Sequence, residues 1–335
     1  MFRQRPRKLV RALVFLAVVI AVPLTVYALT PVPGALLGRL VIDSWSNVKQ
    51  PADYDSIVPT VTVVRNVAVP VADAPEAKLD VYVPRSVTSP RPMILWIHGG
   101  AFIGGTKEDA GVFATMLAHG GYTVATLGYT RPPDARYPTP VRQADAALGY
   151  LREHAAEYHG DPTRLFVGGN SAGAQLASQT AAVETNPALA TAMRLAPAVP
   201  PGSLRGALLY CGAYDLVTLK QIRAPYFHVA LWTYTGYRDW LGFPAIDQLS
   251  TVHQITADYP PAFVTGGDAD ALTPQSHELA AALRQHGVPV TTEFWEGSGA
   301  KLGHDYQFDF TLPQARQTFQ DTLRFLATRS QEAAR

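Results

Sequence analysis

LFVGGNSAG, residues 165–173, is the stretch that decides the fold of this chain. Its first three residues are apolar and predict a buried strand, and the alanine-rich run Ala172–Val183 is predicted as a helix. The glycines around Ser171 permit a sharp, strained turn between these two elements. A strand–turn–helix of this kind lifts a serine hydroxyl above the edge of a sheet, where it can act as a nucleophile. A plain glycine-rich turn would explain the motif if it stood alone.

A second glycine motif, His98-Gly99-Gly100-Ala101-Phe102, supplies what a nucleophilic serine requires. It follows the short apolar run Met93–Ile97, which is predicted as a strand. Glycine lets backbone N–H groups approach a ligand because no Cβ intervenes. We expect the N–H groups of Gly99, Gly100 and Ala172 to form an oxyanion hole for charge developing on an attacked carbonyl. The His98 ring is expected to hold the loop in place.

A serine hydroxyl also needs a base and a carboxylate that orients the base. Of nine histidines, His304 lies in a loop after the last predicted strand, from which a base can reach back over the sheet edge. Asp268 and Asp270 both follow the predicted strand Ala262–Thr265. Asp270 is preferred as the acid because it lies further out in the loop, and Asp268 is its rival. The order along the chain is then Ser, Asp, His.

Strand-like and helix-like runs alternate from Val61 onward, which predicts an α/β fold with a mostly parallel sheet covered on both faces. Residues 61–330 are predicted as the catalytic domain and residues 43–60 as a linker. The aromatic-rich stretch 215–256 breaks the alternation and is predicted as a small cap over the sheet edge, although an ordinary packed subdomain would have the same composition. The predicted strands are Val61–Val69, Lys78–Val83, Met93–Ile97, Tyr122–Leu127, Leu165–Val167, Leu204–Leu209, Ala262–Thr265 and Val290–Phe294, and the predicted helices are Val141–His154, Ala172–Val183, Thr273–His286 and Pro313–Thr328.

Residues 1–42 are predicted as a basic N-terminus followed by a hydrophobic anchor or signal segment. Five basic residues precede a stretch from Ala12 to Gly38 that contains no charged residue. The apolar run is close to the minimum length for a membrane-spanning helix, and the basic cluster favours a cytoplasmic N-terminus. We therefore expect a single-pass membrane protein with an extracytoplasmic catalytic domain. Cleavage near Ala28, which would give a secreted protein, is the alternative.

The composition excludes several other classes of function. The formal net charge is only +1, and no basic stripe interleaved with aromatic residues suggests a nucleic-acid partner. The single cysteine, Cys211, cannot form a disulfide within the chain. No Cys/His cluster has the spacing of a structural zinc site. A serine nucleophile with its base and acid needs no metal or organic cofactor, so none is expected.

The region from Val61 to Thr328 resembles the α/β-hydrolase superfamily, and within it the hormone-sensitive-lipase-like carboxylesterases. The resemblance implies Ser171 as nucleophile, His304 as base and Asp270 as the orienting acid. The departures from the family pattern are Ala101 for a frequent third glycine, Asn170 for a frequent acid, Ala174 for a glycine and Asp305 for a glycine. The matching segments are His98–Phe102, Tyr129–Pro133 with Tyr137-Pro138, Gly160–Arg164 and Asp270–Leu272.

These observations predict a serine carboxylesterase, lipase-like in its motifs, that hydrolyses short-to-medium-chain esters through an acyl-enzyme. The expected partner is a small-molecule or lipid-like ester. A serine peptidase or amidase on the same fold would use the same three residues. A non-catalytic hydrolase-fold protein that binds partners at the cell surface is a third reading, and intact candidates at all three positions argue against it.

Overall fold

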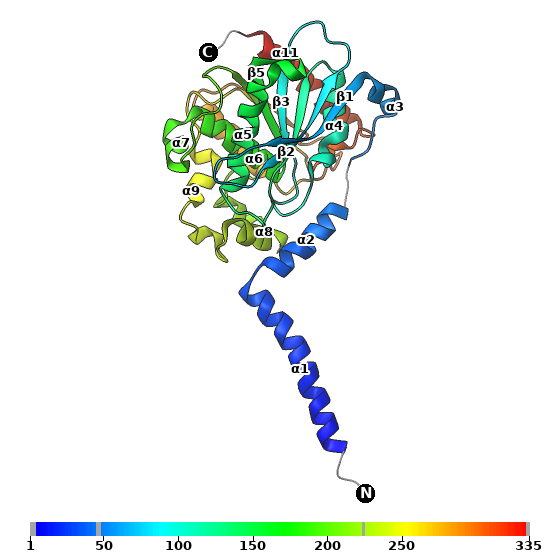
Figure 1. Cartoon of the computed structure of the whole chain (residues 1–335), viewed down its shortest axis with the longest axis vertical. Coiled ribbons are helices and arrows are strands. Elements are labelled where there is room, and N and C mark those ends of the chain that lie inside the picture. The colour runs from blue at the N-terminus through cyan, green and yellow to red at the C-terminus, as the bar shows by residue number, and fades with distance from the viewer. Residues whose placement is uncertain (1–4, 45–47, 223–224, 333–335) are drawn as a thin grey trace.

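The computed structural model describes residues 5–44, 48–222 and 225–332. Its centre is an eight-stranded sheet in the order β1-β2-β4-β3-β5-β6-β7-β8 (Figure 1). The β1–β2 and β2–β4 pairs are antiparallel, and the other pairs are parallel. The strands are β1 Val61–Val69, β2 Ala77–Pro84, β3 Arg91–Ile97, β4 Thr123–Gly128, β5 Gly160–Asn170, β6 Leu204–Tyr210, β7 Ala262–Gly266 and β8 Val290–Phe294. The predicted mostly parallel sheet is therefore confirmed.

Helices cover both faces of the sheet and bury two separate cores. Along β3, Leu95 and Ile97 face one core, whereas Ile94 and Trp96 face the other, as the two-residue period of a strand requires. Helices α5, α6, α7 and α10 close the first core, and α4 and α11 close the second. These helices are α4 Gly111–His119, α5 Thr139–Glu153, α6 Ala172–Thr185, α7 Pro187–Met193, α10 Thr273–Gln285 and α11 Pro313–Gln331.

The boundaries of α10 differ slightly from the prediction. The helix begins at Thr273, as predicted, but ends at Gln285 rather than His286, and Leu272 rather than Thr273 occupies its N-cap position. The Thr273 hydroxyl instead donates to the Gly267 carbonyl at 2.7 Å. This bond ties the start of α10 to the end of β7, the strand whose following loop carries Asp268 and Asp270. Helix α4, which the sequence analysis did not predict, is almost uniformly apolar and lacks the periodicity that reveals an amphipathic helix.

The aromatic-rich stretch 215–256 contains helix α8 (Pro225–Thr235), the short helix α9 (Ile246–Leu249) and several single turns. It interrupts the strand–helix alternation between β6 and β7, as the sequence indicates. The N-terminal helix α2 (Val32–Ser44) packs on it, because Ala35, Ile103 and Ala230 form one small buried cluster. The cap region, α2 and the loop after β3 therefore share an apolar contact.

Helix α1 (Arg5–Leu29) extends away from the body of the molecule, and α2 lies between α1 and α8 (Figure 1). Several large apolar side chains of α1, among them Leu13, Phe15 and Leu29, are exposed. None of the helices in the described part of the chain combines the length and the apolar character needed to cross a membrane. The transmembrane segment predicted within residues 1–42 is therefore without support in this structure.

Candidate active site

Ser171 occupies the turn between β5 and α6, which confirms the strand–turn–helix read from the sequence. Its backbone lies at φ 54° and ψ −123°, a strained conformation for a residue with a side chain. Gly169 and Gly173 are required beside it: a Cβ on Gly173 would lie 2.1 Å from the Ile97 carbonyl oxygen, and one on Gly169 would lie 2.5 Å from Gly173. The two glycines therefore let β5, β3 and α6 approach closely enough to form the turn.

The structure brings the three predicted triad residues together at the carboxyl ends of the strands. The Ser171 hydroxyl lies 2.9 Å from His304 Nε2, and His304 Nδ1 lies 2.9 Å from Asp270 Oδ2. A neutral imidazole that donates from Nδ1 to the carboxylate leaves Nε2 free to accept the serine proton. The arrangement therefore has the base and orienting acid that activate a serine nucleophile.

Asp268 has a different set of partners from Asp270. Its carboxylate accepts hydrogen bonds from the amides of Leu302 and Lys301, at 2.6 and 3.3 Å, and from the Ser298 hydroxyl at 3.1 Å. These contacts hold the loop that ends at His304. Asp268 thus braces the loop, whereas Asp270 reaches the imidazole itself.

The His304 imidazole lies between two carboxylates. Asp270 lies at Nδ1, and Asp305 Oδ2 lies 3.9 Å from Nε2. Burial alone would lower the pKa of His304, but Asp305 and Asp270 outweigh it and raise the pKa to about 9. Both carboxylates therefore stabilise the protonated form of the imidazole.

The loop after β3 has the backbone shape of an oxyanion-binding turn. Gly100, Ala101 and Phe102 have φ values of 113°, 51° and 65°, and a Cβ on Gly100 would lie 2.2 Å from the Gly104 carbonyl oxygen. The His98 ring stacks on Tyr129 with centroids 4.4 Å apart, and burial lowers its pKa to about 4. His98 is thus a neutral structural residue, as expected.

The three amides predicted to bind the oxyanion differ in their surroundings. The Gly99 N–H donates to Asn170 Oδ1 at 3.2 Å, so this amide is occupied by a side chain. Among the described residues, the N–H groups of Gly100 and Ala172 have no such partner. The geometry therefore favours Gly100 and Ala172 as the donors and gives Gly99 a structural bond, which differs from its predicted role.

Three residues that the sequence analysis did not assign to the site connect its parts. Asn170 Nδ2 donates to Asp305 Oδ2 at 2.9 Å, and the Cys211 thiol donates to Asp305 Oδ1 at 3.0 Å. Asn170 and Asp305 stood out in the sequence only as departures from the family pattern. In the structure they bridge the oxyanion loop, the nucleophile turn and the histidine loop.

The end of α2 is fastened to the oxyanion loop by charged groups. Asp43 Oδ1 accepts from the Gly105 amide at 2.7 Å, and Arg131 donates to the Gly105 carbonyl at 2.6 Å and to Asp43 at 3.3 Å. Arg39 donates to the Ile103 carbonyl at 2.8 Å. Asp43 begins the segment predicted as a linker, and nothing in that prediction indicates these contacts.

Aromatic residues of the cap region lie next to the loop and the triad. Phe102 stacks on Tyr234 of α8 with centroids 4.2 Å apart, and Tyr137 meets Tyr234 edge to face. Burial, together with the charges of Asp270 and Asp305, raises the pKa of Tyr226 at the start of α8. Helix α8 therefore packs an aromatic ring on the loop after β3, and its first turn lies within the electrostatic influence of Asp270 and Asp305.

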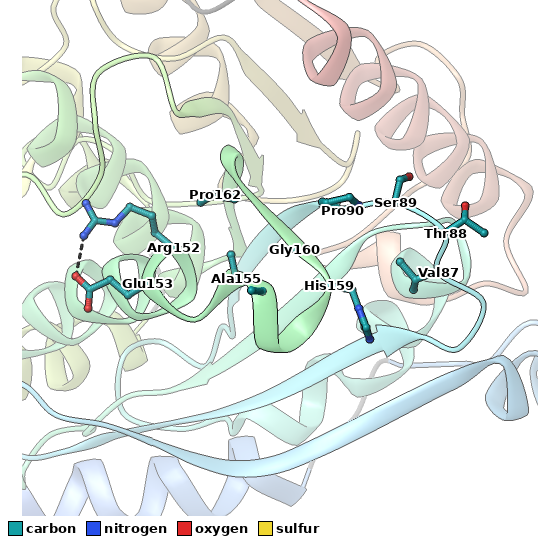
Figure 2. Close-up of a pocket in the computed structure, with 11 residues that line it drawn as sticks. Val87, Thr88, Ser89, Pro90, Arg152, Glu153, Ala155, His159, Gly160 and Pro162 are labelled. Atoms are coloured by element: carbon teal, nitrogen blue, oxygen red, sulfur yellow. Dashed lines mark hydrogen bonds and ion pairs between the residues drawn. The ribbon is translucent and has the colours of Figure 1, made fainter.

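A separate pocket of about 520 Å³ lies at the amino-terminal ends of β3 and β5 (Figure 2). It is lined by Pro90 and Gly160, which precede β3 and begin β5, and by Arg152, Glu153 and His159. Ser171 follows the carboxyl end of β5, whereas this pocket lies at the amino end of the same strand, so the pocket is separate from the triad.

A serine on a strand–turn–helix, a histidine after the last strand and an acid after the strand before it define an α/β hydrolase. The superfamily assignment made from the sequence is thereby confirmed. The chain belongs to the BD-FAE family, whose model matches residues 79–283.

Curated relatives with sequence similarity are described as esterases. Esterase LipQ of Mycobacterium tuberculosis is 29% identical over 208 residues, which cover 60% of this chain and 48% of LipQ. The probable isoprenylcysteine alpha-carbonyl methylesterase ICMEL1 of Arabidopsis thaliana is 34% identical over 108 residues, which cover 32% of this chain and 23% of that protein. The chain thus spans less than half the length of these relatives.

Solved structures of esterases share the fold. Esterase B from Lactobacillus Rhamnosis superposes with a TM-score of 0.72 at 22% identity, covering 83% of this chain and 91% of that one. A bacterial heroin esterase superposes with a TM-score of 0.66 at 24% identity, covering 84% and 91%. At this level of identity the similarity concerns the fold alone.

Proposed function

We propose that this protein is a serine carboxylesterase in which Ser171 forms an acyl-enzyme. The observation that carries the proposal is the continuous chain of contacts from the Ser171 hydroxyl to His304 Nε2 and from His304 Nδ1 to Asp270, both at 2.9 Å. The names of the esterase relatives agree with ester substrates.

The acylation step follows from these contacts. Ser171 Oγ attacks the ester carbonyl carbon while its proton passes to His304 Nε2. The carbonyl oxygen becomes negatively charged and accepts hydrogen bonds from the amides of Gly100 and Ala172. When the tetrahedral intermediate collapses, the carbon–oxygen bond to the alcohol breaks, and His304 gives its proton to the departing oxygen.

Deacylation reverses these roles with water in place of the alcohol. His304 Nε2 takes a proton from water, whose oxygen attacks the acyl carbon. Collapse releases the carboxylic acid and returns the proton to Ser171 Oγ. Asp270 and Asp305 stabilise the imidazolium in both halves of the cycle.

We further propose that the substrate carries a short-to-medium apolar acyl or alcohol group. The support is the stack of Phe102, in the loop after β3, on Tyr234 of α8, together with the exposed Tyr226 at the start of the same helix. Such side chains favour apolar groups and leave room for few polar contacts.

Membrane attachment through residues 1–42, with the catalytic domain on the outside, is also proposed. Its support is the uncharged stretch from Ala12 to Gly38 behind a basic cluster. Mass spectrometry of the mature N-terminus, together with membrane fractionation, tests this proposal. A soluble protein beginning just after Ala28 would instead establish secretion.

The catalytic proposal is tested with matched p-nitrophenyl esters and anilides of increasing acyl length, assayed on the wild type and on Ser171→Ala. We expect ester turnover by the wild type, highest for short to medium chains, and nearly complete loss in the folded variant. Turnover of anilides alone would establish an amidase. Full ester turnover by Ser171→Ala would exclude the proposed nucleophile.

A further inference from the structure

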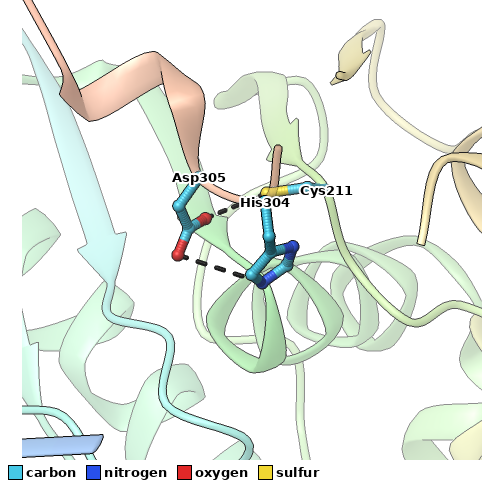
Figure 3. A group of neighbouring side chains, drawn as sticks. All are labelled: Cys211, His304 and Asp305. Carbon is cyan, nitrogen blue, oxygen red and sulfur yellow. Dashed lines mark hydrogen bonds and ion pairs between the residues drawn. The ribbon is translucent and has the colours of Figure 1, made fainter. Parts of the chain in front are cut away.

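A thiol and a carboxylate, two donor groups of different chemistry, lie beside the His304 imidazole (Figure 3). Cys211 follows β6, and His304 and Asp305 lie in the loop after β8. The Cys211 sulfur, a His304 ring nitrogen and an Asp305 oxygen all lie within 4.8 Å of one another. The thiol is fully buried, whereas the other two side chains are 36% and 20% exposed. The cluster is therefore open to solvent on one side.

The spacing of these atoms suits a tetrahedral cation. Zinc holds sulfur at about 2.3 Å and nitrogen or oxygen at about 2.0–2.2 Å, which places neighbouring donor atoms about 3.3–3.6 Å apart. Here the sulfur lies 3.0 Å from Asp305 Oδ1, and His304 Nε2 lies 3.9 Å from Asp305 Oδ2. To reach this spacing the 3.0 Å pair must open, and the 3.9 Å pair must close, by about 0.3–0.6 Å each.

The surrounding contacts already orient the donors. Asp270 accepts from His304 Nδ1 at 2.9 Å, which leaves the lone pair on Nε2, as carboxylates do behind zinc-bound histidines. This lone pair meets the Ser171 hydroxyl at 2.9 Å, and the same nitrogen lies 3.9 Å from Asp305 Oδ2. Asn170 donates to Asp305 at 2.9 Å and fixes the position of that carboxylate. A thiolate, imidazole and carboxylate set selects zinc-like cations over magnesium or calcium, which prefer oxygen donors alone.

We propose that Cys211, His304 and Asp305 form a binding site for a thiophilic divalent cation such as Zn²⁺, and that its occupation switches off the esterase. On binding, the thiol proton leaves to solvent, and the cation takes the thiolate, the Nε2 lone pair and a carboxylate oxygen. A water molecule completes the tetrahedron. The Nε2 lone pair no longer accepts from Ser171, so the nucleophile loses its base. This inhibition rests on the proposed esterase function, whereas the cation site itself does not.

The site is tested first by a measurement that needs no turnover. Chelator-treated wild-type protein is titrated with Co²⁺, whose thiolate complexes absorb by charge transfer. Cys211 is the only cysteine, so such a band reports this site alone. We expect a band that saturates at one equivalent and is displaced by Zn²⁺. It should be absent in Cys211→Ser, which keeps a hydroxyl donor toward Asp305.

The second test compares inhibition by Zn²⁺ in three variants. Removal of a ligand in Cys211→Ser or Asp305→Asn should raise the half-inhibitory Zn²⁺ concentration by at least about 10- to 100-fold, the range known for outer-shell partners. His277→Ala is the matched control, because His277 is an exposed imidazole 2.7 Å from the Glu296 carboxylate. Its half-inhibitory concentration should equal that of the wild type.

The outcomes separate the two proposals. A Co²⁺–thiolate band in a protein that hydrolyses no ester would support the cation site and overturn the proposed function. An active esterase without such a band, or one that Zn²⁺ inhibits equally in wild type, Cys211→Ser and Asp305→Asn, would overturn the cation site. If Cys211→Ser does not fold, Asp305→Asn and the wild-type spectrum decide the question alone.

Discussion

Asp305 should set the pH at which the proposed esterase becomes active. His304 must be neutral to accept the serine proton, so kcat/KM rises with pH as the imidazolium loses its proton. The pKa of His304 is raised to about 9 because the Asp305 and Asp270 charges outweigh the effect of burial. We therefore predict a wild-type activity that increases up to about pH 9 and an Asp305→Asn variant whose profile lies at lower pH.

The size of the shift follows from the distance of 3.9 Å between Asp305 Oδ2 and His304 Nε2. Two unit charges at this separation interact by about 1 kcal/mol in bulk water and by about 4 kcal/mol at an effective dielectric constant of about 20. The His304 side chain is 36% exposed, so solvent screening favours the lower part of this range. A shift of about 1–2 pKa units is expected.

The assay is kcat/KM for a p-nitrophenyl ester from pH 5 to about 10, with EDTA present to exclude cations and Ser171→Ala as the blank for spontaneous hydrolysis. Glu296→Gln is the control, because it removes an exposed carboxylate that pairs with His277 rather than with the triad. Its profile should match that of the wild type. An Asp305→Asn midpoint at or above the wild-type midpoint would refute the reasoning.

Three further predictions concern other carboxylates. Asp270→Asn should lower kcat by about 10³- to 10⁴-fold, because it removes the negative charge that stabilises the imidazolium and lets its amide N–H favour the wrong imidazole tautomer. Asp268→Asn, which loosens only the loop at Leu302, should cost far less; steady-state kinetics that reverse this order would reassign the acid. Asp43→Ala should lower kcat by about 10- to 100-fold with little change in KM, because it frees the Gly105 amide from α2. Asp43→Asn keeps an acceptor oxygen and should recover part of the lost kcat. An equal loss of kcat in both variants would contradict a positioning role for Asp43. Burial beside Glu184 raises the pKa of Asp145 to about 9, so the folded state holds the Asp145 proton more tightly than the unfolded state does, and the protein loses stability as pH rises between about 4 and 9. Thermal melts of Asp145→Asn should show a smaller loss of stability over this pH range. The same pH dependence in Asp145→Asn and the wild type would refute this prediction.

Local requirements explain why the nucleophile turn was predictable from sequence. Gly169 and Gly173 have no room for a Cβ, so the close packing of β5 and α6 against β3 requires the glycines of the Gly-x-Ser-x-Gly pattern. The buried strands were predictable for a similar reason, since β3 is apolar on both faces and covered by helices on each.

Contacts between distant segments could not be read from the sequence. Asp268 and Asp270 are two residues apart in one loop, and only the fold decides that the first meets backbone amides while the second meets His304. The bridge from Asn170 to Asp305 spans 135 positions. Asp43 was predicted to begin a linker, because the residues next to it in the sequence do not indicate that the end of α2 contacts the oxyanion loop.

The central claim is that Ser171, activated by His304, attacks an electrophilic carbon or phosphorus. The most direct measurement is the covalent labelling of intact protein by a fluorophosphonate, with the modified residue located by mass spectrometry. The account predicts a single adduct on Ser171 in the wild type and a much slower reaction in folded His304→Ala. An adduct on another residue, or labelling of Ser171 at an equal rate in both proteins, would contradict it.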